Sequence, residues 1–430
     1  MEDLPSNMPQ GAYGLYEPEG FSIWINQQYQ SELSVKNTGV LSHEFTHYVH
    51  SLSTIHSIDD LISLLFFVHA GIQRLEELSV PVSLPLSRWS AVNDCPPEIK
   101  NYVEGMDARR FRIKESLGLR LDPAPPATEQ NGCLYSNGGK LFIKTSSVTG
   151  VPVARLALME GAALAKKCEA LGNDSDLKAK KNNPALSHYY AVHDCCSLTN
   201  PWIDPLSASA LLCDISLCSL YPSQVFKSGI EILSELPASA TLNDFEISLM
   251  QLYDQECRRW MNSRLAALEQ ARDLLPENHR SEENPSWAHL LLLNAISAVR
   301  LRQEYPFSLI KPVYLGWELF ELAKVVGSPV ILTNDMRLTS LAVTSNEVSL
   351  ARDAVRTLSY ICRWLLEDVG PLQCPYAGCP GCPKDRVGEH CFTNASLALI
   401  PSDDKPWCAL LSSAHQLRVA HLLRREVIRG

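Results

Sequence analysis

Residues 41–56 have the sequence LSHEFTHYVHSLSTIH, which concentrates side chains that bind metal ions. Four of the twelve histidines of the chain lie in this stretch. His43 and His47 are four residues apart, so on a helix both imidazoles project from one face and reach a single ion. Glu44 follows the first histidine, where its carboxylate reaches a water on that ion without binding the metal. This HExxH spacing predicts a zinc site at which Glu44 takes a proton from water that attacks a carbonyl.

The helix that must position these side chains is amphipathic. At about 100° per residue, one arc holds the apolar residues Leu41, Phe45, Tyr48, Val49, Leu52 and Ile55. His43, His47 and His50 fall together on nearly the opposite side. A histidine placed only for packing needs no companions one turn away, so the pattern favours a metal-binding face over a helix with coincidental histidines.

A catalytic zinc needs a third protein ligand and keeps one position open for water. The segment 151–172, VPVARLALMEGAALAKKCEALG, predicts a helix with Pro152 in its first turn and Gly172 after its end. Glu160 lies at the centre of its apolar stripe, where an unpaired carboxylate is costly and a divalent cation removes that cost. Glu160 is therefore the expected third ligand, and pairing with an arginine or capping of a loop is the alternative. The small residues 161–163 should let another helix approach closely.

His50 offers another imidazole. Ligands at i, i+4 and i+7 on one straight helix rarely converge on a tetrahedral ion, so we expect His50 beside the ligands or facing substrate. The metzincin continuation of the motif places Gly at 50 and His at 53. His50 and Ser53 argue against that class.

Together, HEFTH (43–47) and MEGAALA (159–165) resemble the gluzincin zinc metallopeptidases, in which a glutamate on a later helix completes the site. The resemblance implies that His43, His47 and Glu160 are the zinc ligands and that Glu44 is the general base. It also implies that the predicted strand GFSIWIN (20–26) is the edge strand that aligns an extended peptide.

Gluzincins also use a histidine or a tyrosine to stabilise the oxyanion. The segment SHYYAVHD (187–194) supplies four candidates, His188, Tyr189, Tyr190 and His193. Tyr190 and His193 are assigned to the site, although each of the four could equally be a packing residue.

Four cysteines cluster in a loop rich in proline and glycine: Cys374, Cys379, Cys382 and Cys391. Their spacing predicts a closed tetrahedral site in which a second, structural zinc orders the loop. An iron–sulfur cluster and scattered free thiols are the alternatives. The other ten cysteines, including Cys195, Cys196, Cys213 and Cys218, are expected to be small buried residues with reduced thiols.

Composition narrows the class of protein. Hydrophobic residues make up 46% and charged residues 20% of the 430 residues, as in globular proteins. A net charge of −10 argues against a nucleic-acid-binding surface. The longest apolar run, at 61–72, is shorter than the about 20 residues of a membrane span, so no membrane partner is expected. The N-terminus has no apolar core of a secretory signal, which predicts a cytoplasmic protein.

The expected fold class is α+β and predominantly α-helical, with a zincin-like core, a small N-terminal sheet and a large helical C-terminal region. Strands are predicted in 20–29 and 140–146, loops at 80–100 and 118–140, and a polar connector at 172–184. Apolar periodicity predicts helices at about 39–57, 58–78, 151–171, 204–220, 242–275, 286–304, 311–326, 347–368 and 406–428. The expected segments are a metallopeptidase core (1–200), a helical region (201–370) and the cysteine loop with a last helix (371–430).

These features predict a zinc metallopeptidase that cleaves a protein or peptide substrate. An intracellular protease must be restrained, so a regulatory partner is expected as well. One alternative is a zinc hydrolase or deacylase that acts on a small amide. Another is a non-catalytic metal-containing scaffold, which would have no need of Glu44 as a base.

Overall fold

The structure of the chain is a computed structural model. It describes residues 14–17, 21–26, 35–66, 82–84, 86, 100, 130–131, 133–137, 140–145, 150–275, 286–311, 319–333, 338–339 and 427–429. The predicted cysteine cluster at 374–391 and the predicted helix at 347–368 lie outside the described residues. The chain forms two compact units. Unit 1 comprises 1–16, 23–59 and 112–342, and unit 2 comprises 17–22, 60–111 and 343–430.

Unit 2 has one described pair of strands. Strands β3 (Val82–Leu84) and β10 (Val427–Arg429) run parallel, with Val427 opposite Val82. The sequence predicted a loop at 80–100 and a helix at 406–428. The helix prediction is wrong for its last two residues, because a pairing partner more than 300 residues away leaves no local signal.

Unit 1 is mostly helical. Its helices are α1 (Val35–Ser53), α6 (Arg155–Leu171), α7 (Ser175–Lys181), α8 (Ser187–Thr199), α9 (Pro205–Leu217), α10 (Pro222–Glu235), α11 (Leu242–Glu256), α12 (Arg258–Leu274), α13 (Trp287–Glu304) and α14 (Leu319–Val326). Helix α2 (Ile55–Phe66) begins in unit 1 and ends in unit 2, and residues 184–186 form a 3₁₀ helix. The prediction of a mainly helical chain with small sheets is confirmed.

Local signals explain several helix ends. The side chain of Asp204 caps α9 by accepting from the Ser207 backbone N–H, and Thr241 and Asp244 form a capping box on α11. The single helix predicted at 242–275 is two helices, α11 and α12, which meet at Cys257. The predicted connector at 172–184 contains α7, and unit 1 runs continuously through residue 200, where a boundary was predicted.

The first sheet has the strand order β1 (Gly14–Glu17), β2 (Ser22–Ile25), β8 (Val330–Thr333), β9 (Leu338–Thr339). Phe21, Ile23 and Ile25 are buried, which confirms the predicted alternation. The expectation that this strand forms the sheet edge is wrong, because β2 lies between β1 and β8. Among the described strands, β1 is the edge on this side.

The second sheet is an antiparallel meander of β4 (Gln130–Asn131), β5 (Leu134–Asn137), β6 (Lys140–Ile143) and β7 (Val151–Pro152). Strand β6 confirms the strand predicted at 140–146, whereas β4 and β5 lie in a predicted loop. Pro152 pairs with Phe142 in the sheet. The helix predicted from residue 151 therefore starts only at Arg155, and it ends before Gly172 as expected.

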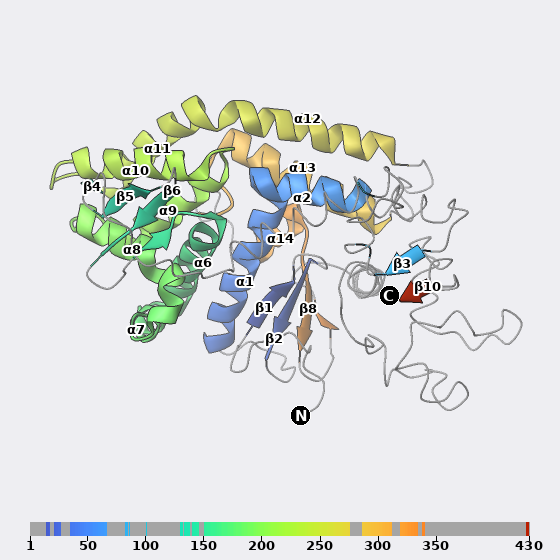
Figure 1. The fold of residues 1–430 in the computed structure, drawn as a ribbon, viewed down its shortest axis with the longest axis horizontal. Helices are drawn as coiled ribbons and strands as arrows, with labels where there is room; N and C mark the ends of the chain where they lie inside the picture. The colour runs from blue at the N-terminus through green and yellow to red at the C-terminus, as the bar shows by residue number, and fades with distance from the viewer. Residues whose placement is uncertain are drawn as a thin grey trace, which may run out of the picture. The chain divides into compact units, whose positions relative to one another are not determined.

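Helix α6 lies at the centre of unit 1 and packs against α1, α8 and α9. Figure 1 shows α1 and α6 side by side. A Cβ atom at Gly161 would lie 3.2 Å from the Sγ atom of Cys213 on α9 and 3.4 Å from the Cβ of Val192 on α8. The absence of a side chain at Gly161 thus permits the close helix approach that the sequence predicted.

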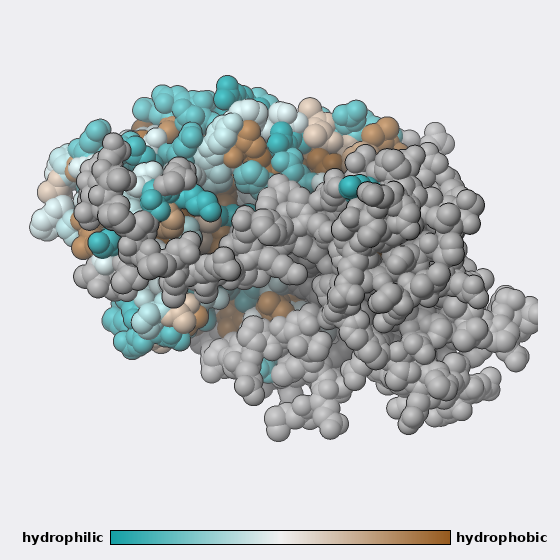
Figure 2. All heavy atoms as spheres, viewed as in Figure 1, coloured by the Kyte–Doolittle hydropathy of each residue, from teal (hydrophilic) through white to brown (hydrophobic). Residues whose placement is uncertain are grey.

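The surface of α12 is largely hydrophilic. Figure 2 shows mainly hydrophilic residues along this helix. Met261 and Leu268 are its buried residues, and α12 packs on α13. None of the helices within the described residues has the length and apolarity that crossing a membrane requires.

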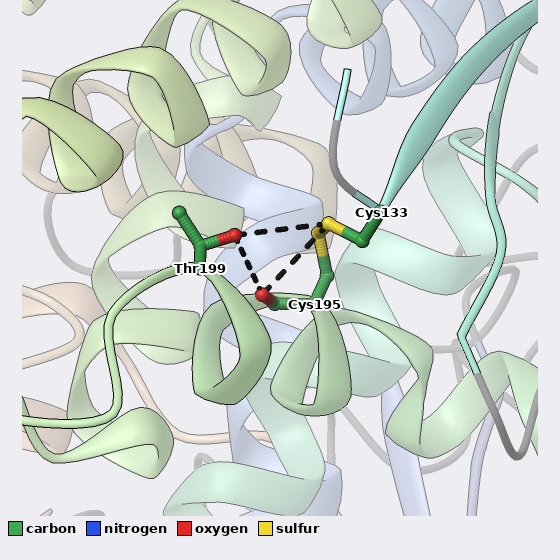
Figure 3. The surroundings of a disulfide bond; sticks show 3 residues. All are labelled: Cys133, Cys195 and Thr199. Carbon is green, nitrogen blue, oxygen red and sulfur yellow. Dashed lines mark hydrogen bonds between the residues drawn. A yellow bond between two sulfur atoms is a disulfide. The ribbon is translucent and has the colours of Figure 1, made fainter. Parts of the chain in front are cut away.

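A disulfide joins the second sheet to α8. Cys133, in the turn before β5, is bonded to Cys195 on α8, and their Cα atoms are 5.7 Å apart (Figure 3). The hydroxyl of Thr199 donates to the carbonyl of Cys195 at 2.8 Å beside this bond. The prediction of a reduced thiol is therefore wrong for Cys133 and Cys195, because sequence spacing does not show which thiols meet. Within the described residues, five other cysteines are free and buried as expected, Cys168, Cys196, Cys213, Cys218 and Cys257.

Removal of the disulfide should destabilise unit 1. The bond closes a loop with a sequence separation of 62. We expect the double variant Cys133→Ala, Cys195→Ala to lose about 2 to 4 kcal/mol of unfolding free energy, because the unfolded chain regains loop entropy. Denaturant unfolding measures this loss.

Cys196→Ala is the matched control, since it removes a buried free thiol from the same helix. Dithiothreitol should lower the melting temperature of the wild type and leave that of the double variant unchanged. Alkylation of both Cys133 and Cys195 without reductant would contradict the assignment.

Candidate metal centre

Helix α1 is buried on both of its faces. The predicted apolar stripe is confirmed, since all of its members are at most 3% exposed: Leu41, Phe45, Tyr48, Val49, Leu52 and Ile55. The imidazole face is buried as well, with His43 at 9%, His47 at 7% and His50 at 0% exposure. This face packs against α6, so the histidines lie inside unit 1.

Three donor atoms meet between α1 and α6. The Nε2 atoms of His43 and His47 are 3.2 Å apart, and the Oε2 atom of Glu160 lies 3.3 Å from the first and 3.5 Å from the second. Ligand atoms that bind one tetrahedral zinc at 2.0–2.2 Å are about 3.3 to 3.6 Å from one another. The triangle of donor atoms therefore has the size that a zinc ion requires.

The charges at this triangle are strongly coupled. Burial alone would raise the pKa of the Glu160 carboxyl, but the imidazoles of His47 and His43 hold it well below its usual value. Burial likewise lowers the pKa of His47, and the charge of Glu160 more than reverses this and raises it. The Oε2 atom of Glu160 has no hydrogen-bond partner within the described part of the chain. A cation between the three atoms would satisfy it.

Glu44 lies at the margin of the triangle. His43, Glu44 and His47 each offer one ligand atom within 4.8 Å of the others, but the oxygen of Glu160 is closer to both rings, so Glu160 fits a ligand and Glu44 a neighbouring base. Glu44 is 7% exposed and has no hydrogen-bond or ion-pair partner among the described residues. Its carboxylate is thus available to accept a proton.

Strand β1 passes beside this carboxylate. A Cβ atom at Gly14 would lie 3.0 Å from Oε1 of Glu44 and 2.5 Å from Val40, so the glycine leaves the carboxylate uncovered by a side chain. Tyr16 stacks near the ring of His47 at a centroid distance of 6.5 Å. The edge strand beside the site is β1 and not β2, the strand for which the resemblance implied this position.

Helix α8 presents His188 and Tyr189 toward the site. The Tyr189 ring is 6.2 Å from the His43 ring and 4.4 Å from the His188 ring. Burial raises the pKa of Tyr189, and Glu160 and Glu44 add to this effect, so its hydroxyl remains protonated. These contacts bring two of the four residues predicted on α8 to the metal centre.

The two residues assigned from the sequence occupy other positions on α8. Tyr190 is fully buried, and Nδ1 of His193 lies 3.3 Å from Asp194. No described contact joins either residue to the triangle of donor atoms. Sequence reasoning identified the segment without its orientation, because the face that α8 turns to α1 depends on long-range packing.

Lys180 was not predicted to lie near the site. It belongs to α7, in a segment predicted as a polar connector, and its ammonium lies 3.5 Å from the centroid of the Tyr189 ring. Burial lowers its pKa, and Asp176, Glu160 and Glu44 partly offset the effect. A cation therefore stands close to the candidate site.

His50 lies in a buried polar network. Its Nε2 lies 3.0 Å from Asp214 on α9, and the guanidinium of Arg302 on α13 donates to both oxygens of Asp214 at 2.7 and 2.8 Å. All three side chains have 0% exposure. Of the two positions expected for His50, the one that faces substrate is wrong, because these contacts enclose it in the core. A position beside the candidate ligands stays a prediction.

Comparison of the chain with known protein families, with curated proteins and with solved structures gave no match. The likeness to gluzincins therefore depends on the HExxH motif and on the geometry of the side chains around it. Within the described residues, His43, Glu44 and His47 form a group that could hold a metal ion.

Loss of Glu160 should abolish metal binding at this centre. We expect Glu160→Ala to bind one equivalent of zinc fewer per chain than the wild type, because two imidazoles alone leave the ion under-coordinated. Inductively coupled plasma mass spectrometry of dialysed protein measures the zinc content.

Glu169→Ala is the matched control, since Glu169 lies on the same helix with its side chain 61% exposed and paired with Lys166. It should keep the zinc content of the wild type. Equal zinc content in Glu160→Ala and wild type would mean that protons, not a metal, hold the three atoms together.

The ion pair of Asp214 and Arg302 predicts a pH-dependent contribution to stability. Burial raises the pKa of Asp214, but Arg302 more than reverses this and lowers it to about 2. A carboxyl whose pKa is lower in the folded than in the unfolded state stabilises the protein above its unfolded pKa. As the pH falls from about 4 to 2, protonation of Asp214 should lower the unfolding free energy of the wild type by about 2 kcal/mol. Asp214→Ala should not show this decrease.

At neutral pH, Asp214→Ala should lower the free energy of unfolding by about 3 to 5 kcal/mol, because Arg302 remains buried without its partner. Asp254→Ala removes an exposed ion pair with Arg258 and should lower the free energy of unfolding by less than about 1 kcal/mol. Urea unfolding at several pH values measures both variants. If the unfolding free energies of Asp214→Ala and Asp254→Ala were equal at every pH, the buried ion pair would contribute no more to stability than the exposed one.

Proposed function

We propose that the chain is a zinc-dependent peptidase of the gluzincin type. The observation that carries the proposal is the meeting of the donor atoms of His43, His47 and Glu160 beside the buried and unpaired carboxylate of Glu44. Two nitrogens and one carboxylate oxygen form the ligand set of catalytic zinc sites that keep a position for water.

In this proposal His43, His47 and Glu160 hold the metal. Bound zinc would supply Lewis acidity and would lower the pKa of a water molecule to about 7. Glu44 would accept the proton of the attacking water and deliver it to the leaving amine. The carboxylate of Glu44 suits this role because no ion pair or hydrogen bond within the described residues occupies it.

Substrate would be aligned by β1. An extended peptide that pairs with this edge strand would pass Gly14 and Tyr16, and so would bring a carbonyl toward Glu44. The protonated hydroxyl of Tyr189 would then donate to the developing oxyanion. The ring contact with His43 supports this assignment over Tyr190 and His193.

The proposal predicts that Glu44→Gln keeps the zinc content of the wild type and loses hydrolysis by about 10²- to 10⁴-fold, because the amide cannot accept the proton. Mass spectrometry of a peptide mixture after incubation measures cleavage. Glu169→Gln should cleave as the wild type does. A chelator should stop cleavage by the wild type and by Glu169→Gln until zinc is restored.

The same experiment separates the alternatives. Cleavage that depends on Glu44 for small acylated amides but for no peptide would identify a deacylase. Absence of any Glu44-dependent cleavage in a zinc-loaded chain would identify a non-catalytic metal protein and would refute the proposal.

A further inference from the structure

Lysines on α6 and α7 differ in their partners. Four of the five are paired with carboxylates, Lys166 with Glu169, Lys167 with Asp176, Lys178 with Asp174 and Lys181 with Asp194. Lys180 has no ion-pair partner in the part of the chain that the structure describes. Among these five lysines, the ammonium of Lys180 is therefore the one without a carboxylate in ion-pair contact.

The position of Lys180 makes this absence informative. Its ammonium lies over the ring of Tyr189, at 3.5 Å from the centroid, and the side chain is only partly exposed. A cation–π contact compensates only part of the hydration that an ammonium loses. An ion held in this way attracts a negatively charged group more strongly than an exposed lysine does, because the local dielectric is lower.

Tyr189 connects the ammonium to the metal centre. The ammonium of Lys180 lies 3.5 Å from the centroid of the Tyr189 ring, and this centroid lies 6.2 Å from that of the His43 ring. A peptide advances by about 3.3 to 3.6 Å per extended residue, so the two groups are within reach of one short substrate. The ammonium thus lies within the length of a short peptide from the metal centre.

His188 supplies a second, independent feature. Its Nδ1 atom is buried and has no hydrogen-bond partner among the described residues, and its ring lies 4.4 Å from that of Tyr189. Buried polar atoms are nearly always paired, so an unpaired one beside an unpaired cation indicates a place for a bound group.

A purely structural role explains Lys180 less well. A cation in the last turn of a helix interacts favourably with the helix dipole. Lys178 and Lys181 already occupy that turn of α7 and are paired with acids. Helix stability gives no reason to hold a third lysine over an aromatic ring beside the metal centre.

We propose that Lys180, Tyr189 and His188 form a subsite that binds a carboxylate of the substrate next to the metal centre. This inference rests on the proposed function and narrows its substrate class to peptides or small amides with a negative charge near the scissile bond. The ammonium, which lies over the Tyr189 ring, provides the ion pair, and the side chain of His188 provides a hydrogen bond.

A singly charged group fits this subsite better than a phosphate. The ammonium of Lys180 supplies one positive charge, which a carboxylate matches and a phosphate dianion would exceed. The carboxylate can come from the C-terminus of a peptide or from an acidic side chain.

Binding measurements test the subsite without relying on turnover. The zinc-loaded full chain carries Glu44→Gln, so that probes are not consumed, and isothermal titration calorimetry measures three of them. These are N-acetyl-dialanine with a free carboxylate, its C-terminal amide, and the α-amide of N-acetyl-alanyl-glutamate, which has only a side-chain carboxylate. At least one carboxylate probe should bind about tenfold more tightly than the dialanine amide.

Variants then assign the preference to Lys180. Addition of Lys180→Met should abolish the preference for a carboxylate and leave binding of the dialanine amide unchanged. Lys180→Arg should largely retain the preference. Lys178→Met is the matched control, since Lys178 lies on the same helix with its side chain 73% exposed, and it should keep the preference. A preference for the free C-terminus indicates a carboxypeptidase-like site, and one for the side chain indicates selection of acidic residues.

Equal binding of all three probes would overturn the subsite, and so would an equal loss in Lys180→Met and Lys178→Met. If Lys180→Met fails to fold, equal binding of the three probes by the chain that keeps Lys180 still overturns the subsite. Carboxylate binding without any hydrolysis by the wild type would refute the peptidase and leave the subsite standing. Hydrolysis without a carboxylate preference would refute the subsite and leave the peptidase standing.

Discussion

The Oε2 atom of Glu160 is buried beside two imidazole nitrogens, and the geometry of the candidate site depends on this contact. A carboxylate removed from water is costly unless a cation or several donors surround it. The contact therefore requires that α1 and α6 be held at a fixed separation and rotation. The packing of α8 and α9 against α6, close at Gly161, supports that helix from another side.

A second buried network orients α1. His50 follows His47 by about one turn and is bound to Asp214 on α9, which Arg302 on α13 holds through two hydrogen bonds. One helix thus carries both the candidate ligands and an anchor that reaches two other helices. The anchor restricts rotation of α1, and rotation is the motion that would separate its imidazoles from Glu160. Side chains without any contact to substrate can in this way determine the geometry of the site.

The parts of the site that follow local rules could be predicted from the sequence. The spacing of His43 and His47 places both rings on one helix face, and the apolar neighbours of Glu160 indicated that its carboxylate would be buried. The mainly helical fold and the strand at β2 followed from periodicity. Features that depend on long-range packing could not be predicted in this way. They include the position of β2 between β1 and β8, the face of α8 that meets α1, the placement of Lys180 and the disulfide between Cys133 and Cys195.

The proposed function requires one zinc ion between α1 and α6. Anomalous X-ray diffraction at the zinc edge, from crystals of the zinc-loaded chain, locates such an ion. We expect an anomalous peak about 2.0 to 2.2 Å from Nε2 of His43, Nε2 of His47 and an oxygen of Glu160. Fully occupied zinc elsewhere in the chain, with no peak between these three atoms, would contradict this expectation.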